Sequence, residues 1–225
     1  MKTPSLPAAL AALLILAAPI RAQKLTNQIE GPGFGCTDAQ KTAVDTAAGE
    51  ASKRVWRAKM GYAGIGPASD DLQAAELDQQ KRRAQALEET LFGKNDTDIG
   101  FYLSNMYTLL TPAKRDIRCA KASDKNCTMR SGYFKRGEKP IWVCPNFFKS
   151  NAEQQARTIV HESAHAAGIS ESSGSESYCV IFTCADTCGK EAGQGTRVAD
   201  NWSQFVHCAA GQPADKAEAI TATKK

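Results

Sequence analysis

The chain has few histidines, no long hydrophobic run beyond its N-terminus, and little net charge. Only three of its 225 residues are histidine. The apolar residues 8–18 form too short a run to span a bilayer, and no later run is long and apolar enough. The formal charge is +4, and +2 without Lys2 and Arg21. These absences exclude a membrane span in the mature chain and argue against a nucleic-acid partner.

The first 22 residues have the pattern of a signal peptide. Lys2 precedes the apolar residues 8–18, Pro19 ends them, and Ala22 is a small residue suited to cleavage. We therefore expect a secreted or periplasmic protein, and a monomer. The remaining 203 residues suffice for one hydrophobic core. With no internal repeat or domain boundary in view, we predict one domain at residues 23–210 and a flexible tail at 211–225.

Cysteine is plentiful by comparison, and every cysteine lies in the mature part. An even number in an exported chain indicates up to four disulfides. The alternative is a structural zinc site, because Cys184 and Cys188 are close together and near His207 and Cys208. The eight are Cys36, Cys119, Cys127, Cys144, Cys179, Cys184, Cys188 and Cys208.

Two of the three histidines stand four residues apart in residues 161–165, which read H-E-S-A-H. On a helix, His161 and His165 lie on one face, so both imidazoles can bind one metal ion. The neighbouring carboxylate of Glu162 is of the kind that takes a proton from a metal-bound water. The pattern therefore predicts a catalytic zinc site with Glu162 as general base.

Local signals place this motif in a helix. Ser150 and Glu153 form a candidate capping box, and Gly168 stands where the helix should end. Other capping and apolar patterns predict helices over 37–59, from Asp70 or Asp71 onward, and over 98–110. Residues 141–144 read as a short strand, and the stretch 113–139 reads as turn-rich and polar.

Zinc in a catalytic site needs a third protein ligand and an open position for water. The spacing around Gly168 mimics the metzincin frame, but the chain has no methionine after Met129 for the required methionine turn. That class is therefore set aside. Glu171 and Glu176 are the remaining candidates, and Glu176 lies in a turn able to bring its carboxylate back over the helix end.

Four blocks of sequence resemble the deuterolysin and peptidyl-Lys metallopeptidase family, the aspzincins. They are residues 35–37 (GCT), 141–148 (IWVCPNFF), 158–165 (TIVHESAH) and 199–205 (ADNWSQF). The resemblance implies an α+β, mainly helical, zincin-like metallopeptidase domain with a small sheet and disulfides. It also implies one catalytic zinc held by His161, His165 and an acidic residue, here Glu176 in place of the family's Asp. Tyr178 would stabilise the oxyanion.

The same resemblance implies disulfides Cys36–Cys119 and Cys127–Cys144, with the cysteines from Cys179 onward as an extra set. Asp200 stands where lysine-specific members bind the substrate ammonium, although Ser203 replaces the second acidic residue of that pair. Asp200 is thus a candidate substrate-binding residue, or alternatively the N-cap of a helix over 201–208.

Together these features predict a secreted zinc metalloendopeptidase acting on protein or peptide substrates, with a preference for lysine as one expectation. Two alternatives share the same residues. One is a non-catalytic, disulfide-rich binding module with structural zinc. The other is a zinc hydrolase of cell-wall peptides.

Overall fold

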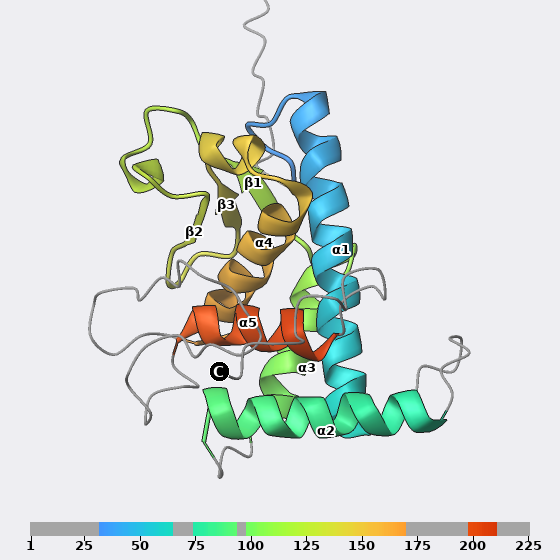
Figure 1. Ribbon diagram of the computed structural model, residues 1–225. Coiled ribbons are helices and arrows are strands. Elements are labelled where there is room, and N and C mark those ends of the chain that lie inside the picture. The colour runs from blue at the N-terminus through green and yellow to red at the C-terminus, as the bar shows by residue number, and fades with distance from the viewer. Residues whose placement is uncertain (1–31, 65–73, 94–97, 170–197, 211–225) are drawn as a thin grey trace, which may run out of the picture.

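The computed structural model describes residues 32–64, 74–93, 98–169 and 198–210, and these form five α-helices, two 3-10 turns and one small sheet (Figure 1). The fold class is α+β and mainly helical, as predicted. The helices are α1 (Asp38–Ala63), α2 (Ala74–Leu91), α3 (Ile99–Leu110), α4 (Ala152–Ala166) and α5 (Ala199–Ala209). The strands are β1 (Ile117–Cys119), β2 (Gly132–Phe134) and β3 (Ile141–Val143), and the 3-10 turns are η1 (Lys125–Cys127) and η2 (Pro145–Lys149).

Helix α1 is the longest helix among the described residues and begins where the helix over 37–59 was predicted to begin. The Thr37 hydroxyl accepts from the Gln40 backbone N–H, and the Gln40 side chain accepts from the Thr37 N–H, which completes a capping box. The helix runs four residues beyond the predicted end at Lys59. Gly61 continues the helix, and it is Gly64 that adopts the left-handed conformation (φ 67°) that ends it.

The sheet has the order β1-β3-β2, with β1 parallel and β2 antiparallel to β3. Strands β2 and β3 pack against α4, and α1, α3 and α5 also pack against α4 (Figure 1). Strand β3 was predicted, whereas β1 and β2 lie in the stretch expected to be turns. With three residues each, they are too short to display the alternation by which a strand is recognised.

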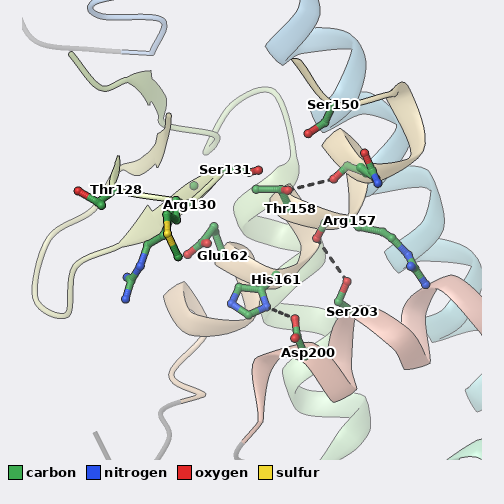
Figure 2. A pocket seen from close by; sticks show the side chains of 13 residues that line it. Thr128, Arg130, Ser131, Ser150, Arg157, Thr158, His161, Glu162, Asp200 and Ser203 are labelled. Atoms are coloured by element: carbon green, nitrogen blue, oxygen red, sulfur yellow. Dashed lines mark hydrogen bonds and ion pairs between the residues drawn. The ribbon is translucent and has the colours of Figure 1, made fainter. Parts of the chain in front are cut away.

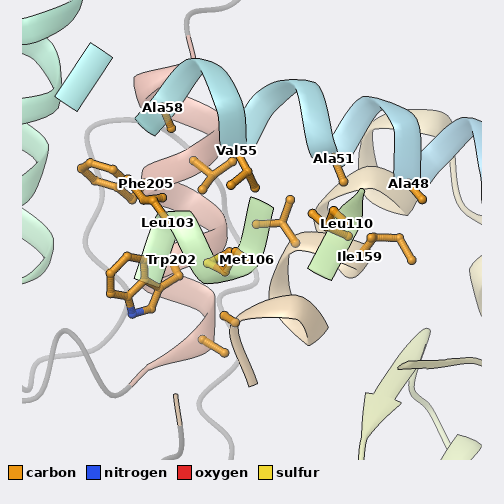
Figure 3. Close-up of a cluster of buried hydrophobic side chains, with 14 of the residues drawn as sticks. Ala48, Ala51, Val55, Ala58, Leu103, Met106, Leu110, Ile159, Trp202 and Phe205 are labelled. Carbon is orange, nitrogen blue, oxygen red and sulfur yellow. The ribbon is translucent and has the colours of Figure 1, made fainter. Parts of the chain in front are cut away.

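The hydrophobic core lies where α1, α3, α4 and α5 meet (Figure 3). The predicted apolar stripe of α1 is buried there, with Val55 and Ala51 fully inaccessible. From α5, Trp202 is also fully buried, and its ring packs against Phe92 at 4.6 Å and Tyr102 at 5.3 Å between centroids. Burying aromatic and aliphatic side chains in this way fixes α5 in place beside α4.

Two disulfides tie the sheet to its surroundings, and both are the pairs that the resemblance implies. Cys36–Cys119 joins the start of α1 to β1, and Cys127–Cys144 joins η1 to the end of β3. By constraining the unfolded chain, disulfides closing loops of 83 and 17 residues each stabilise by about 3–5 kcal/mol. Cys208 is disulfide-bonded as well, which excludes it as a ligand of the alternative structural zinc site.

Several predictions fall on residues outside those described. They concern the signal peptide, the start of the second helix, the tail at 211–225, and the cysteines Cys179, Cys184 and Cys188. Glu171, Glu176 and Tyr178 also lie outside the described residues. Within the described ranges, no helix has the length and apolar character needed to cross a membrane.

Candidate metal centre

Helix α4 carries the H-E-x-x-H motif, as predicted, but its cap differs from the prediction by one residue. Asn151, not Ser150, is the N-cap, and its side-chain oxygen accepts from the Gln154 N–H at 2.9 Å. The Ser150 hydroxyl instead donates to the Asn146 carbonyl in the preceding turn. Both residue types favour caps, so the sequence alone could not choose between adjacent positions. Gly168, just past the helix end, has φ 104°, a conformation open mainly to glycine.

The four-residue spacing brings the two imidazoles and the intervening carboxylate together. One ligand atom each from His161, Glu162 and His165 lie within 4.8 Å of one another. The two rings are 4.9 Å apart between centroids and nearly perpendicular. Among the described residues, this is the cluster of histidine, cysteine and carboxylate groups with the geometry to hold a metal ion.

Hydrogen bonds on the far side of each ring fix which nitrogen faces the cluster. His161 Nδ1 lies 2.6 Å from an Asp200 carboxylate oxygen, and His165 Nδ1 lies 2.9 Å from the Ile169 carbonyl oxygen. A carbonyl oxygen and an ionised carboxylate can only accept hydrogen bonds, so in both rings Nδ1 is the donor and carries the proton. In a neutral ring this leaves the lone pair on Nε2, which is buried in both cases. This donor set fits zinc, which binds neutral imidazole nitrogen and often uses histidines held by a carboxylate or carbonyl.

Asp200 therefore lies beside the metal cluster, in the first turn of α5 (Figure 2). The alternative prediction that Asp200 caps a helix over 201–208 is wrong. The helix begins at Ala199 with Val198 as N-cap, so Asp200 is inside the helix and its side chain is used by His161. Sequence reasoning missed this contact because the two residues are 39 positions apart.

A cleft of about 490 Å³ opens beside His161 and Glu162. One wall is the loop of residues 128–131 with the start of β2, and the other consists of α4 and the first turns of α5 (Figure 2). Met129 stands in this loop with 93% of its side chain exposed and φ 62°, the left-handed region that non-glycine residues rarely adopt. The cleft leads to the metal cluster, with His161 and Glu162 among its lining residues.

Gly132 sets how closely β2 approaches the motif. A Cβ at this position would lie 2.9 Å from Thr158 Cγ2, 3.1 Å from the Trp142 carbonyl oxygen and 3.3 Å from Glu162 Cγ. These distances are too short for a side chain to fit without displacing its neighbours. Glycine is therefore required for the strand to lie against α4 beside the carboxylate of Glu162.

Charged groups continue along α4 away from the motif. Arg157 lines the cleft, and its side chain points away from His161 (Figure 2). Burial lowers the pKa of Arg157 to about 10, so the guanidinium remains charged at neutral pH. Glu153, one turn earlier, contacts Arg54 of α1 at 2.7 Å and His207 of α5 at 2.8 Å. The hydrogen bond from His207, together with Arg54, holds the pKa of Glu153 well below its usual value.

The structure thus brings together His161, Glu162, His165 and Asp200 from the sequence-predicted set. It adds cleft residues that the sequence did not single out, among them Met129 and Gly132. Both lie in the stretch read as turns, and only the approach of β2 to α4 in space reveals their position.

Comparison with known proteins gives likenesses among solved structures but none among family models or curated proteins. Among solved structures, a zinc peptidase from Grifola frondosa matches with 17% sequence identity and a TM-score of 0.45, over 76% of this chain and 96% of that one. Zinc peptidase is the class that the sequence resemblance predicts. At this identity and TM-score, the match assigns no function to this chain.

Proposed function

We propose that the protein is a zinc-dependent metallopeptidase that hydrolyses peptide bonds in its cleft. The observation that carries this proposal is the pair of imidazoles, one buried and one half-buried, each with its Nδ1 hydrogen-bonded, beside the carboxylate of Glu162. His161 and His165 would hold the metal through Nε2. A third ligand from Glu176, or from Glu171 as the alternative, belongs to the proposal.

Bound zinc would lower the pKa of a water towards about 7 and polarise the scissile carbonyl. Glu162 is then the general base. Its carboxylate accepts a proton from the attacking water and delivers it to the leaving amine. Glu162 is 4% exposed, so its carboxylate acts where water is largely excluded. Tyr178 is proposed to stabilise the oxyanion.

Strand β2 supports a peptide as the substrate. It is one of the two edge strands of the sheet within the described residues, and its first residue, Gly132, lines the cleft beside Glu162. An edge strand offers backbone N–H and C=O groups to an extended chain, which can bind as an added strand. A peptide bound in this way would run past the metal cluster, with its side chains alternating between the cleft and solvent.

The remaining expectations are part of the same proposal. They are secretion or export to the periplasm after removal of residues 1–22, a single domain over 23–210, and a monomeric protein. The disulfides are consistent with an oxidising compartment. A preference for lysine stays a proposal that the experiment below also tests.

Digestion of a mixed peptide library tests this function. The purified protein should cleave the library, lose activity with a zinc chelator, and regain it when zinc is restored. Mapping the cleavage sites gives the side-chain preference in the same experiment. Binding of zinc in stoichiometric amount with no chelator-sensitive cleavage would instead favour the non-catalytic binding module. Cleavage confined to cell-wall peptides would favour the third candidate.

A further inference from the structure

We propose that Asp200 is a positioning residue for the metal centre, which holds His161 in place, and that it is not a receptor for a substrate ammonium. This inference rests on the proposed function, because it assigns a role towards the metal. It differs from the role that the family resemblance implies for the same residue.

The contact itself is short and shielded from water. His161 Nδ1 and Asp200 Oδ1 are 2.6 Å apart, with side-chain exposures of 7% and 6%. A charge-assisted hydrogen bond of this length is stronger than a neutral one, and more so away from solvent. It keeps the proton on Nδ1 and fixes the rotation of the ring, so that Nε2 faces Glu162 and His165.

Helix α5 is aligned so that this contact is held in register. Three polar contacts join the two helices, and we call them the α4–α5 seam. They are Glu153–His207, Arg157–Ser203 and His161–Asp200. They advance by four residues along α4 and by three or four in the opposite direction along α5, which is one contact per helical turn. Asp200 also lies in the first turn of α5, where the helix dipole favours an anion.

The same geometry engages the one acidic residue of α5, Asp200, with His161 where it lines the cleft. Asp200 is 4% exposed, and its carboxylate is used by His161. Ser203, at the second position of the family's acidic pair, is 2% exposed and donates to the Arg157 carbonyl at 3.3 Å. With Oδ1 bound to His161, recognition of an ammonium by Asp200 would fall to its other oxygen alone, without the second acidic residue of the family's pair. The structure therefore assigns Asp200 to the metal side of the site.

Zinc affinity separates the two roles. The holoprotein and the variants Asp200→Asn and Asp200→Ala are compared by competition with a chromophoric chelator. Asp200→Asn keeps the shape and an acceptor but removes the charge, and we expect zinc affinity to fall about 10-fold. Asp200→Ala removes the acceptor too, and the fall should approach about 100-fold. Asp45→Asn, which neutralises an exposed carboxylate paired with Arg115 on another face, is the matched control and should leave zinc affinity unchanged.

Peptide hydrolysis completes the test, measured with the zinc concentration near its dissociation constant. Two peptides are compared, identical except that one has lysine and the other norleucine at a single position. A positioning role predicts that Asp200→Asn lowers kcat/KM for both peptides by the same factor, and that excess zinc restores most of the loss. Unchanged zinc affinity together with a rise in KM for the lysine peptide alone would overturn the inference. A wild-type chain that binds no zinc would overturn the proposed function. A zinc-binding chain indifferent to both Asp200 variants would overturn only this assignment.

Discussion

The apolar core around Trp202 and the α4–α5 seam use the same helix α5 in opposite ways. Trp202 and Phe205 bury rings among other hydrophobic side chains, where volume and shape determine the packing. Asp200 and Ser203, on the same turns, each bond to one named partner on α4. The core therefore determines whether α5 is present beside α4, and the seam determines how the metal ligand is oriented. Changes in the two regions should have different consequences.

The largest loss of stability is expected from Trp202→Ala. The side chain is fully buried and contacts the rings of Phe92 and Tyr102. Removing it creates a cavity, which should lower the free energy of unfolding by about 3–5 kcal/mol. Denaturant unfolding measures this change, with Phe101→Ala as control because Phe101 is 62% exposed and should contribute less than about 0.5 kcal/mol. Equal losses for both variants would contradict the assignment of the core.

Gly132→Ala should damage the site more than the fold. The added methyl meets Thr158 Cγ2 at 2.9 Å and Glu162 Cγ at 3.3 Å, so β2 or α4 must shift beside the general base. We expect a loss of about 1–3 kcal/mol in stability and a fall in kcat larger than this loss explains. The double variant Gly132→Ala with Thr158→Ser removes the closest contacting atom and should recover part of the activity. No recovery would place the damage at the Trp142 carbonyl instead.

Met129→Gly should increase stability. Met129 has φ 62° and no burial to offset the backbone strain. Glycine should relieve about 1 kcal/mol of this strain. The entropy that glycine adds to the unfolded chain offsets part of that gain. Thermal unfolding of Met129→Gly beside Met129→Ala measures this, since alanine removes the side chain but keeps the strain. A stabilisation by alanine equal to that by glycine would show that the backbone conformation carries no cost.

The smallest effect is expected at the outer end of the seam. The pKa of Glu153 is lowered on folding, by His207 first and then by Arg54, so the stabilising contribution is present above the ordinary pKa of 4.5. It is lost as the pH falls below that value towards the lower pKa of the folded state. Because the carboxylate is 41% exposed, the effect should be modest. Glu153→Gln should flatten the acid side of a stability–pH curve, and an unchanged curve would contradict this role.

The sequence predicted the parts of the fold that depend on local signals. The capping box at Thr37, the apolar stripe of α1 and the helix carrying His161 and His165 each depend on residues within one or two turns of each other. The strands β1 and β2 were missed because pairing with β3, and not their own short sequences, makes them strands. Residue type likewise could not decide whether Ser150 or Asn151 is the N-cap of α4, because both residues favour that position.

The contacts that complete the site were beyond the reach of local patterns. Asp200 could be read as a substrate receptor or a cap, and only the packing of α5 on α4 brings it to His161. Gly132 looked like one glycine in a turn-rich stretch, until its distance to Thr158 and Glu162 was known. Both depend on elements that meet across long stretches of chain, and this is information that spacing within one helix does not carry.

The most direct test of the central claim is to measure bound zinc and peptide turnover together in the Glu162→Gln protein. Glutamine has nearly the same shape but cannot act as the base. The account predicts one zinc per chain, as in the wild type, and a fall in kcat of about 10²–10⁴-fold. Retention of zinc with normal turnover would contradict the assignment of Glu162 as the general base and, with it, the proposed function of the cleft.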